Sequence, residues 1–486
     1  MSGAERILLC PRWLYRGGGR METGKAVLIE GNRILDILPD PAAADGAAAD
    51  SPTGGIDARR IDLPRHVLLP GLINAHTHVG AGPVARGIAE DWSLASGTPF
   101  YVPLTKIWQI AYAPARREGL RAIVRWDVLG MLATGTTCVV NTASADVEGY
   151  LEIARELGIR TYAGPTLPMN VEHRLGTMES GRARRTDLAS ADEQADDLKF
   201  FRALHEQWNG AAGDRIRTVL GPASAHTVEP EVLRQVRATA VELDVPVTTH
   251  LCQAPSEIDE VQRRHGTTPA RLLADIGLLD ERMICAHGTY LPADDIPLVA
   301  ESHATVAHCG VRKAREAITS PFTAFAEAGI RVAIGTDAFT ADLVQEMRSA
   351  VTLGKIATGR TDRPAAGDIV DAATLGGAEG LGRSDLGRIA PGAIADLTAI
   401  RLGGVENRPV FDPLAAVVHY STGADVDLVM VDGVVRVQGG AVVGADLDAA
   451  ADAAAAALEE VWAAARQAGL VGHGSLAPAE PAGAAG

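Results

Sequence analysis

The stretch PGLINAHTH, residues 70–78, decides the fold of this 486-residue chain. Its apolar start predicts a buried strand, and the strand ends in two histidines separated by one residue. Side chains alternate along a strand, so His76 and His78 share one face. Two imidazoles on one face at a strand end suit the binding of a divalent cation. Such a triplet also arises by chance among 13 histidines, so its meaning depends on the rest of the chain.

Further β-rich runs follow this strand, and longer amphipathic segments separate them. The eight predicted strands lie at 72–78, 137–142, 160–166, 217–224, 246–251, 283–288, 304–309 and 331–337. Residues 229–244 and 293–303 are examples of predicted helices, because their apolar residues recur at three- and four-residue spacing. Alternation of strands and helices is typical of a parallel sheet, and eight strands close a TIM barrel. We therefore predict the α/β class, with a (β/α)8 barrel over residues 67–385.

Both chain ends have a different texture, with short strands joined by Gly-rich turns. Asp432-Gly433 between two apolar runs predicts a hairpin. Residues 1–66 and 386–445 are therefore expected to form a small split β-sandwich domain into which the barrel is inserted. Residues 446–486 are expected to be an Ala-rich helix followed by a disordered tail.

The charge balance and the cysteines limit the partners and the compartment. Lys plus Arg is 45 against 61 for Asp plus Glu, so the net charge is −16, which disfavours nucleic acid and anionic membranes as partners. The five cysteines are scattered without a CxxC pair, which indicates reduced thiols. We see neither the pattern of a signal peptide nor an uncharged apolar run long enough to span a membrane. A cytoplasmic protein is the expectation.

Three more strand ends carry residues that bind metals. His250 ends the fifth predicted strand, His287 ends the sixth and Asp337 ends the eighth. Each residue alone has an ordinary explanation, such as a satisfied core histidine or an aspartate that caps the next helix. In a barrel, however, these ends converge with His76 and His78 on one mouth. The combination favours a metal site.

These motifs resemble those of the amidohydrolase superfamily, in the branch that holds triazine hydrolases, guanine deaminase and S-adenosylhomocysteine deaminase. The resemblance spans about residues 20–440 and rests on PGLINAHTH, HLCQ, AHG, GTD and LGRIAPGAIADLTAI. It implies a hydrolase of a non-peptide C–N bond in a small molecule, which uses a metal-bound hydroxide, and by analogy a homodimer. Zn²⁺ is the default metal for three histidines and an aspartate, although Fe²⁺ and Co²⁺ also occupy such sites. The implied metal ligands are His76, His78, His250 and Asp337, and the implied catalytic residues are His287 and Asp337.

A shortage of lysine favours one metal ion per chain. Binuclear relatives bridge two metals with a carboxylated lysine at the end of the fourth strand. Only five lysines occur in this chain, and none lies in the run 217–226. Lys199, the nearest one before this run, belongs to the preceding predicted helix.

The chain departs from the family pattern at Gln253, where family deaminases carry a glutamate that delivers a proton. Glutamine forms hydrogen bonds but cannot deliver a proton, so Gln253 is either a catalytic substitute or a residue that orients substrate. Two reactions stay open. One is deamination or dehalogenation of a triazine-, purine- or pyrimidine-like heterocycle, and the other is hydrolysis of a linear amide or urea. Carbamate or thiocarbamate hydrolysis is an alternative, and a catalytically silent binding protein is another.

Further residues are candidates for substrate binding. After the seventh strand, relatives often show HCPxSN, whereas residues 308–313 read HCGVRK. His308 either faces the mouth or is structural, and His226 is a candidate at the end of the fourth strand. The long loop 79–108 holds Trp92 in a cluster of aromatic residues, which either line a pocket or pack the loop.

Overall fold

The computed structural model describes residues 5–40, 56–86, 101–143, 145–169 and 191–470. Trp92 and the tail beyond residue 470 lie outside the described residues. Within them, no helix is both long enough and apolar enough to cross a membrane.

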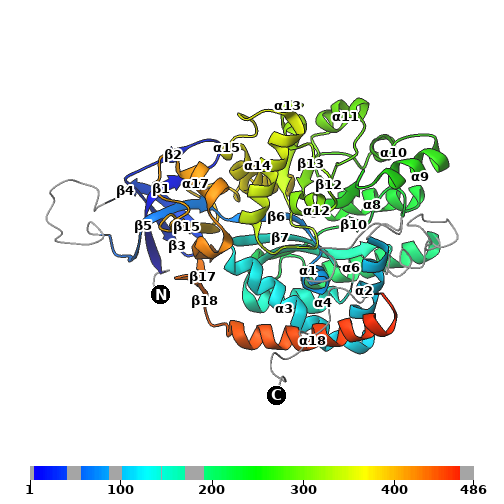
Figure 1. Cartoon of the computed structure of the whole chain (residues 1–486), viewed down its shortest axis with the longest axis horizontal. Helices are drawn as coiled ribbons and strands as arrows, with labels where there is room; N and C mark the ends of the chain where they lie inside the picture. The colour runs from blue at the N-terminus through cyan, green and yellow to red at the C-terminus, as the bar shows by residue number, and fades with distance from the viewer. Residues whose placement is uncertain (1–4, 41–55, 87–100, 144, 170–190, 471–486) are drawn as a thin grey trace, which may run out of the picture.

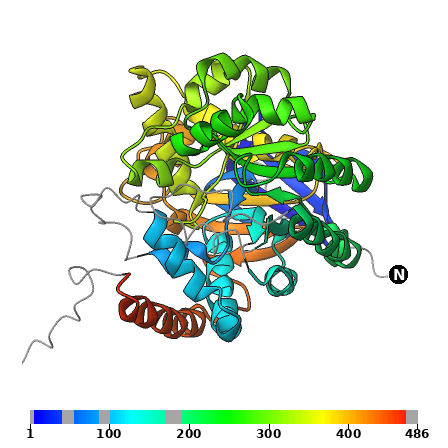
Figure 2. The ribbon, with the colours of Figure 1, turned by 90° about the vertical axis from the view of Figure 1, so that its right-hand side faces the viewer.

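Parallel strands in two sheets form the centre of the molecule (Figures 1 and 2). The first sheet has the order β10-β8-β7-β6, with β9 on β8, and the second has the order β11-β12-β13-β14. Isolated parallel bridges join them at both edges, through Leu220 to Val247 and Ser224 to His250 on one side and Thr77 to Asp337 on the other. The α/β class is confirmed, and the bridges connect the strands into a ring. The strands are β6 (Leu72–Thr77), β7 (Thr136–Ala143), β8 (Arg160–Leu167), β9 (Ile216–Thr218), β10 (Gly221–Pro222), β11 (Val247–Leu251), β12 (Met283–His287), β13 (Thr305–His308) and β14 (Arg331–Ile334).

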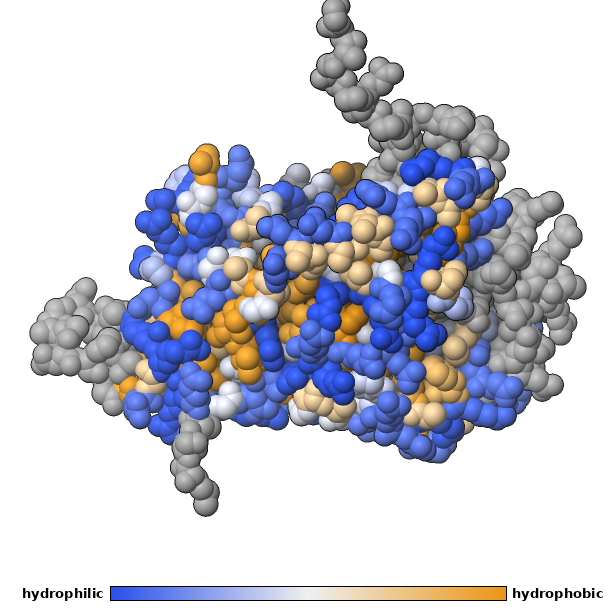
Figure 3. Space-filling view, turned by 90° about the horizontal axis from the view of Figure 1, so that it is seen from below, coloured by the Kyte–Doolittle hydropathy of each residue, from blue (hydrophilic) through white to orange (hydrophobic). Residues whose placement is uncertain are grey.

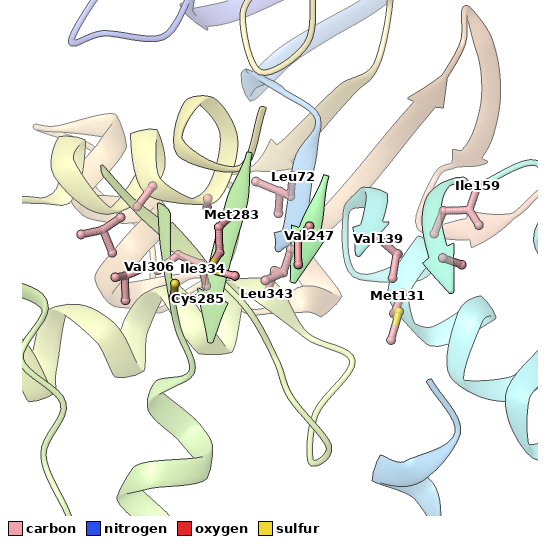
Figure 4. Packing of buried hydrophobic residues seen from close by; sticks show 14 of the residues in the cluster. Leu72, Met131, Val139, Ile159, Val247, Met283, Cys285, Val306, Ile334 and Leu343 are labelled. Atoms are coloured by element: carbon pink, nitrogen blue, oxygen red, sulfur yellow. The ribbon is translucent and has the colours of Figure 1, made fainter. Parts of the chain in front are cut away.

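Alternation along these strands separates two cores. Ile284 and Ala307 face the interior of the ring, in a cluster with Val140 and other residues. Met283 and Val306 face outward into the layer of helices, where Figure 4 shows them among other buried apolar side chains. Because both faces of these strands are covered, every residue of β6, β7, β8, β12 and β13 is buried, polar residues included.

Helices cover the outside of the ring. The predicted helix 229–244 is observed as α8 (Pro230–Leu243), whereas 293–303 is a 3-10 turn, η5 (Ala293–Asp295), followed by α11 (Ile296–Glu301). The other helical elements between the strands are α1 (Ala81–Ala85), α2 (Tyr101–Ala111), η2 (Pro114–Arg116), α3 (Arg117–Ala133), α4 (Val147–Leu157), α6 (Ala191–Trp208), α7 (Ala211–Asp214), α9 (Pro255–His265), α10 (Pro269–Ile276), α12 (Gly310–Arg315), α13 (Phe322–Glu327) and α14 (Leu343–Thr358). After β14 and α14 come α15 (Ala366–Asp371), the π-helix η6 (Ala372–Gly376) and α16 (Gly377–Gly380).

The two chain ends meet in one sheet, with the order β18-β17-β16-β15-β5-β1-β3-β4 and β2 on β1. Strand β5 from the N-terminal part pairs antiparallel with β15 from the C-terminal part. The hairpin at Asp432-Gly433 is confirmed, and both residues have positive φ, 54° and 75°, as a two-residue primed turn requires. The sandwich arrangement and the domain boundaries stay predictions. The strands are β1 (Arg6–Tyr15), β2 (Met21–Glu22), β3 (Lys25–Glu30), β4 (Arg33–Pro39), β5 (Arg59–Pro70), β15 (Leu397–Arg401), β16 (Val426–Val431), β17 (Val434–Gln438) and β18 (Ala441–Val442).

Helices complete the C-terminal part. Helix α17 (Pro413–Tyr420) and the turn η7 (Gly423–Asp425) connect β15 to β16. The predicted Ala-rich helix is α18 (Leu447–Gln467), which packs along α3 and α2 (Figure 1). Viewed from below, hydrophobic residues are interspersed with hydrophilic ones on this side of the molecule (Figure 3).

Candidate metal centre

Five side chains from four strand ends form one cluster. Ligand atoms of His76, His78 and His250 lie within 4.8 Å of one another, and so do those of His76, His287 and Asp337. Because His76 belongs to both groups, the five residues constitute a single site. Among the described residues, these are the only groups of three or more histidine, cysteine or acidic side chains with metal-binding spacing.

The backbone at these strand ends departs from regular strand geometry. The pairing of β6 with β7 shifts register between Asn74 and Thr77, directly at the first histidine. His287 and Asp337 have φ values of 77° and 55°, a region that residues other than glycine seldom adopt. Such conformations cost free energy and cluster at functional sites. Here they redirect side chains at the point where each strand stops.

Close approach of β14 to β6 requires a residue without a side chain. A Cβ atom on Gly335 would lie 2.8 Å from the carbonyl oxygen of His76, which is closer than atoms can pack. Glycine at this position therefore lets the last strand reach the strand that carries the first two histidines.

Backbone carbonyls determine the tautomers of two histidines. Nδ1 of His78 lies 2.9 Å from the oxygen of Thr142, and Nδ1 of His250 lies 2.6 Å from the oxygen of Ala223. A carbonyl only accepts, so each Nδ1 carries the hydrogen and each Nε2 has a bare lone pair. The two Nε2 atoms lie 3.2 Å apart, where they cannot hydrogen-bond to each other. A cation shared between them resolves this contact, and this is how metal-binding histidines are oriented in proteins.

The charge states suit a divalent metal as well. Burial lowers the pKa of His250 to about 3, and burial also holds the pKa of His76 and His287 well below the usual value, so all three rings are neutral. Burial alone would raise the pKa of Asp337, but Arg312 and the nearby histidines hold it well below its ordinary value. Both ring nitrogens of His76 and Oδ1 of Asp337 are buried without hydrogen-bond partners among the described residues. Neutral imidazoles and one carboxylate are the donor set that Zn²⁺ and similar ions prefer, so these residues fit such an ion.

A buried arginine, which the sequence analysis did not single out, completes the site. Arg312 of α12 is 5% exposed, and its Nη1 donates to Oδ2 of Asp337 at 2.7 Å. Its Nε donates to Oε1 of Glu316 at 3.2 Å. The sequence does show that Arg312 and Lys313 form a basic pair in HCGVRK, at the positions where the family pattern has serine and asparagine. The sequence alone does not show that this pair turns inward.

Gln253 lies next to this arginine. With its amide oxygen directed at Arg312, Gln253 accepts hydrogen bonds from Nη2 at 2.9 Å and from Nη1 at 3.3 Å. Its backbone oxygen accepts from Nζ of Lys313 at 3.1 Å, and Lys313 also donates to Oε2 of Glu316 at 2.8 Å. Gln253 is therefore part of a charged network that extends to Asp337.

The remaining candidates have different positions. His308 follows the interior residue Ala307 on β13, so alternation directs its ring outward, where it packs edge-on against Phe322 at 5.5 Å between centroids. This favours the structural alternative for His308 over contact with substrate. His226 is partly buried, its Nδ1 lies 2.8 Å from Oγ of Ser224, and burial lowers its pKa to about 4.

Comparisons of sequence identify close relatives over most of the chain. The profile described as "Amidohydrolase family" matches residues 67–436. The 5-methylthioadenosine/S-adenosylhomocysteine deaminase of Halobacterium salinarum is 35% identical over 404 residues, which cover 82% of this chain and 87% of that protein. The 5'-deoxyadenosine deaminase of Methanothermobacter thermautotrophicus is 30% identical, with coverage of 90% and 95%.

The chain is also similar to solved structures over more than 90% of its length. An adenosine deaminase from Xanthomonas campestris with bound zinc has a TM-score of 0.80 at 25% identity, with coverage of 94% of this chain and 98% of that one. A mutant atrazine chlorohydrolase from Arthrobacter aurescens, complexed with zinc and atraton, has a TM-score of 0.79 at 25% identity, with coverage of 93% and 100%. The chain therefore belongs to the amidohydrolase family and is a hydrolase that acts on carbon–nitrogen bonds other than peptide bonds.

Proposed function

We propose that this enzyme deaminates or dehalogenates a small N-heterocycle by adding water at a single divalent metal ion. The observation that carries the proposal is the pair of bare Nε2 atoms on His78 and His250, 3.2 Å apart beside His76 and Asp337. This arrangement is prepared for a metal at the ends of the parallel strands, where barrel enzymes have their active sites. The names of the relatives, nucleoside deaminases and a triazine-type chlorohydrolase, support an N-heterocycle as the substrate class.

The metal ligands in this proposal are His76, His78, His250 and Asp337. We propose zinc, which the related structures contain, with Fe²⁺ or Co²⁺ as alternatives. A metal ion bound there would lower the pKa of a coordinated water from about 16 toward about 7. One ion per chain is proposed, because strands β9 and β10 and the segment between them carry no lysine.

Two side chains of the cluster handle protons in this proposal. His287 has both ring nitrogens buried without hydrogen-bond partners among the described residues, and its Nε2 lies 3.6 Å from Oδ2 of Asp337. A neutral imidazole at this position orients the attacking water or assists its deprotonation. Asp337 is ionised and takes the proton of the water, which it then passes to the leaving group.

Gln253 supports a second candidate function, hydrolysis of a linear amide, urea or carbamate. The amide of Gln253 cannot supply a proton to a ring nitrogen, and its oxygen already accepts from Arg312. The amine that leaves a linear substrate needs only the proton that Asp337 and His287 collect from water. His226, Trp92 and Gln253 are the proposed contacts to substrate.

Release of product from two substrate panels tests the proposal. Metal-loaded enzyme is assayed for ammonia or chloride with adenosine-type nucleosides and with amino- and chlorotriazines, and for amine with linear amides, ureas and carbamates. Turnover of a heterocycle supports the proposal. Turnover confined to linear substrates replaces it by the second candidate, and no turnover of either panel by protein with one bound metal favours a binding protein.

We also propose a homodimer located in the cytoplasm, with small molecules rather than nucleic acid or membranes as partners. The dimer rests on the family resemblance alone. Five buried cysteines without a disulfide are consistent with a reducing compartment, and the net charge of −16 disfavours polyanionic partners.

A further inference from the structure

Two departures from the family's sequence pattern meet in the fold. Gln253 stands just after β11 where family deaminases carry glutamate, and Arg312 lies in α12 where the pattern has serine. Although 59 positions separate them, the guanidinium of Arg312 donates to the Gln253 amide oxygen at 2.9 and 3.3 Å. An amide oxygen has two lone pairs, so Arg312 uses the full acceptor capacity of this side chain.

The same guanidinium contacts the metal cluster. Nη1 of Arg312 donates to Oδ2 of Asp337 at 2.7 Å, whereas Oδ1 of Asp337 has no hydrogen-bond partner among the described residues. The two oxygens of this carboxylate are therefore not equivalent, because the arginine binds Oδ2, whereas Oδ1, 3.8 Å from Nε2 of His78, is left for a metal. A planar guanidinium with fixed donors can hold two acceptors in one geometry, which a lysine cannot do.

Side chains of two helices form hydrogen bonds with the backbone at Gln253. The N–H groups of Cys252 and Gln253 donate to the two carboxylate oxygens of Glu257, each at 3.0 Å, and Glu257 is 2% exposed. On the other side, Nζ of Lys313 donates to the carbonyl oxygen of Gln253 at 3.1 Å. Helices α9 and α12 thus fix the main chain of a residue whose side chain Arg312 also fixes. Such convergence is expected where the orientation of one side chain matters.

We propose that Arg312 is a positioning residue that orients the metal-binding carboxylate of Asp337 and the amide of Gln253 together. Arg312 and Gln253 act as one unit in place of the acidic side chain found in family deaminases.

The pairing of Arg312 with Gln253 limits which substrate atom can contact Gln253. This inference rests on the proposed function. Because both lone pairs of the Gln253 oxygen are occupied by Arg312, this residue offers only N–H donors to a bound molecule. The substrate atom that meets it is therefore a hydrogen-bond acceptor, such as a carbonyl oxygen or an unprotonated ring nitrogen. Glu at position 253 beside an unchanged Arg312 would form an ion pair with it, so the single substitution Gln253→Glu does not recreate an acid.

The test separates positioning from folding by measuring the metal site without substrate. Arg312→Gln removes the charge and Arg312→Lys keeps the charge but loses the planar donor pair. Arg315→Gln is the matched control, because it removes the same group from the same helix at an exposed position where the guanidinium lies over Phe339. For each protein we measure the Co²⁺ absorption spectrum, the metal dissociation constant by chelator competition, the melting temperature, and kcat and KM separately.

We expect Arg312→Gln to weaken metal binding and lower kcat, each by about 10- to 100-fold. The Co²⁺ spectrum is expected to change in Arg312→Gln and to be partly restored in Arg312→Lys, whereas Arg315→Gln matches the parent. A Co²⁺ spectrum and metal affinity of Arg312→Gln equal to those of the control would overturn the proposal. A lower melting temperature with an unchanged spectrum and affinity would do the same, because it indicates a purely structural role.

A double-mutant cycle tests whether the two residues form one unit. If they do, Gln253→Ala adds little to the loss caused by Arg312→Gln, so the double variant resembles the arginine variant in metal affinity. Losses that multiply in the double variant would show two independent residues and contradict the unit. Both metal measurements are independent of substrate, so a failed substrate panel would count against the proposed function and leave this test valid.

Discussion

At His250, one backbone contact determines what the ring can do. The carbonyl of Ala223 accepts from Nδ1, so Nε2 is left without a hydrogen and faces the equally bare Nε2 of His78. Two buried lone pairs in contact are unfavourable unless a cation binds both. The geometry of two ordinary hydrogen bonds therefore makes the pair a candidate metal-binding site.

His250→Ala tests the ligand assignment at this residue. We expect the variant to lose both its bound metal and its turnover, because one of the two facing nitrogens is removed. Metal content by elemental analysis and kcat on the same sample are the measurements. The control is His303→Ala, an exposed histidine outside the site, which should retain stoichiometric metal. Full metal content in His250→Ala would refute the assignment.

Helices α12 and α14 hold the charged network in place through a buried acid. Glu346 of α14 is fully buried, and its Oε2 accepts from the backbone N–H of Val311 at 3.1 Å, one residue before Arg312. Burial raises the pKa of Glu346 from 4.5 to about 8. The folded protein thus binds this proton more tightly than the unfolded chain does.

The shift predicts a pH dependence of stability. A raised pKa in the folded state stabilises the fold below pH 4.5, and this contribution is lost as the pH rises from 4.5 to about 8. Glu346→Gln does not titrate, so its free energy of unfolding relative to the parent should increase between pH 5 and pH 8. Each pKa unit of difference corresponds to about 1.4 kcal/mol at most. Urea unfolding of both metal-free proteins at several pH values measures it.

An exposed glutamate, Glu301, is the control for the pH dependence of stability assigned to Glu346. Glu301→Gln at the end of α11 should follow the pH dependence of the parent. Parallel curves for Glu346→Gln and the parent would mean that Glu346 does not titrate in this range.

At the scale of the whole molecule, a buried ion pair connects the barrel strands to the sheet made by the two chain ends. Arg160 of β8 is 1% exposed and donates to Asp396 at 2.7 Å and to Asp432 at 3.2 Å. Asp396 immediately precedes β15, and Asp432 lies in the confirmed hairpin turn. The contact therefore joins the sheet that contains β8 to the sheet formed by the two chain ends, through residues more than 200 positions apart.

Removing this arginine should destabilise the protein without changing its chemistry. Arg160→Met leaves the buried carboxylate of Asp396 without its ion-pair partner, which costs about 3–5 kcal/mol. Arg6→Met removes an arginine from an exposed pair with Glu30 and should cost about 1 kcal/mol or less. Chemical unfolding measures both losses, while kcat of folded Arg160→Met is expected to be that of the parent. Equal losses in the two variants would contradict a linking role for Arg160.

Local sequence was sufficient for the strands and for the residues at their ends. The hydrophobic patterns, the Asp-Gly turn and the spacing of PGLINAHTH depend on neighbours a few residues away, and most of these predictions are confirmed. The exceptions are the predicted strand 217–224, which is observed as the two short strands β9 and β10, and the predicted helix 293–303, which is observed as η5 and α11. The convergence of His76, His78, His250, His287 and Asp337 also followed from sequence, because the closure of parallel strands brings their carboxyl ends together.

Only the tertiary structure decided how residues after the strands turn. Whether HCGVRK directs His308 or Arg312 at the site depends on how α12 packs, which is a contact between distant segments that no local pattern encodes. The fold turns His308 outward against Phe322 and brings Arg312 to Asp337 and Gln253. The sequence by itself thus determined the strands of an amidohydrolase-family enzyme and the residues at their ends, whereas long-range packing determined which charged groups surround these candidate metal ligands.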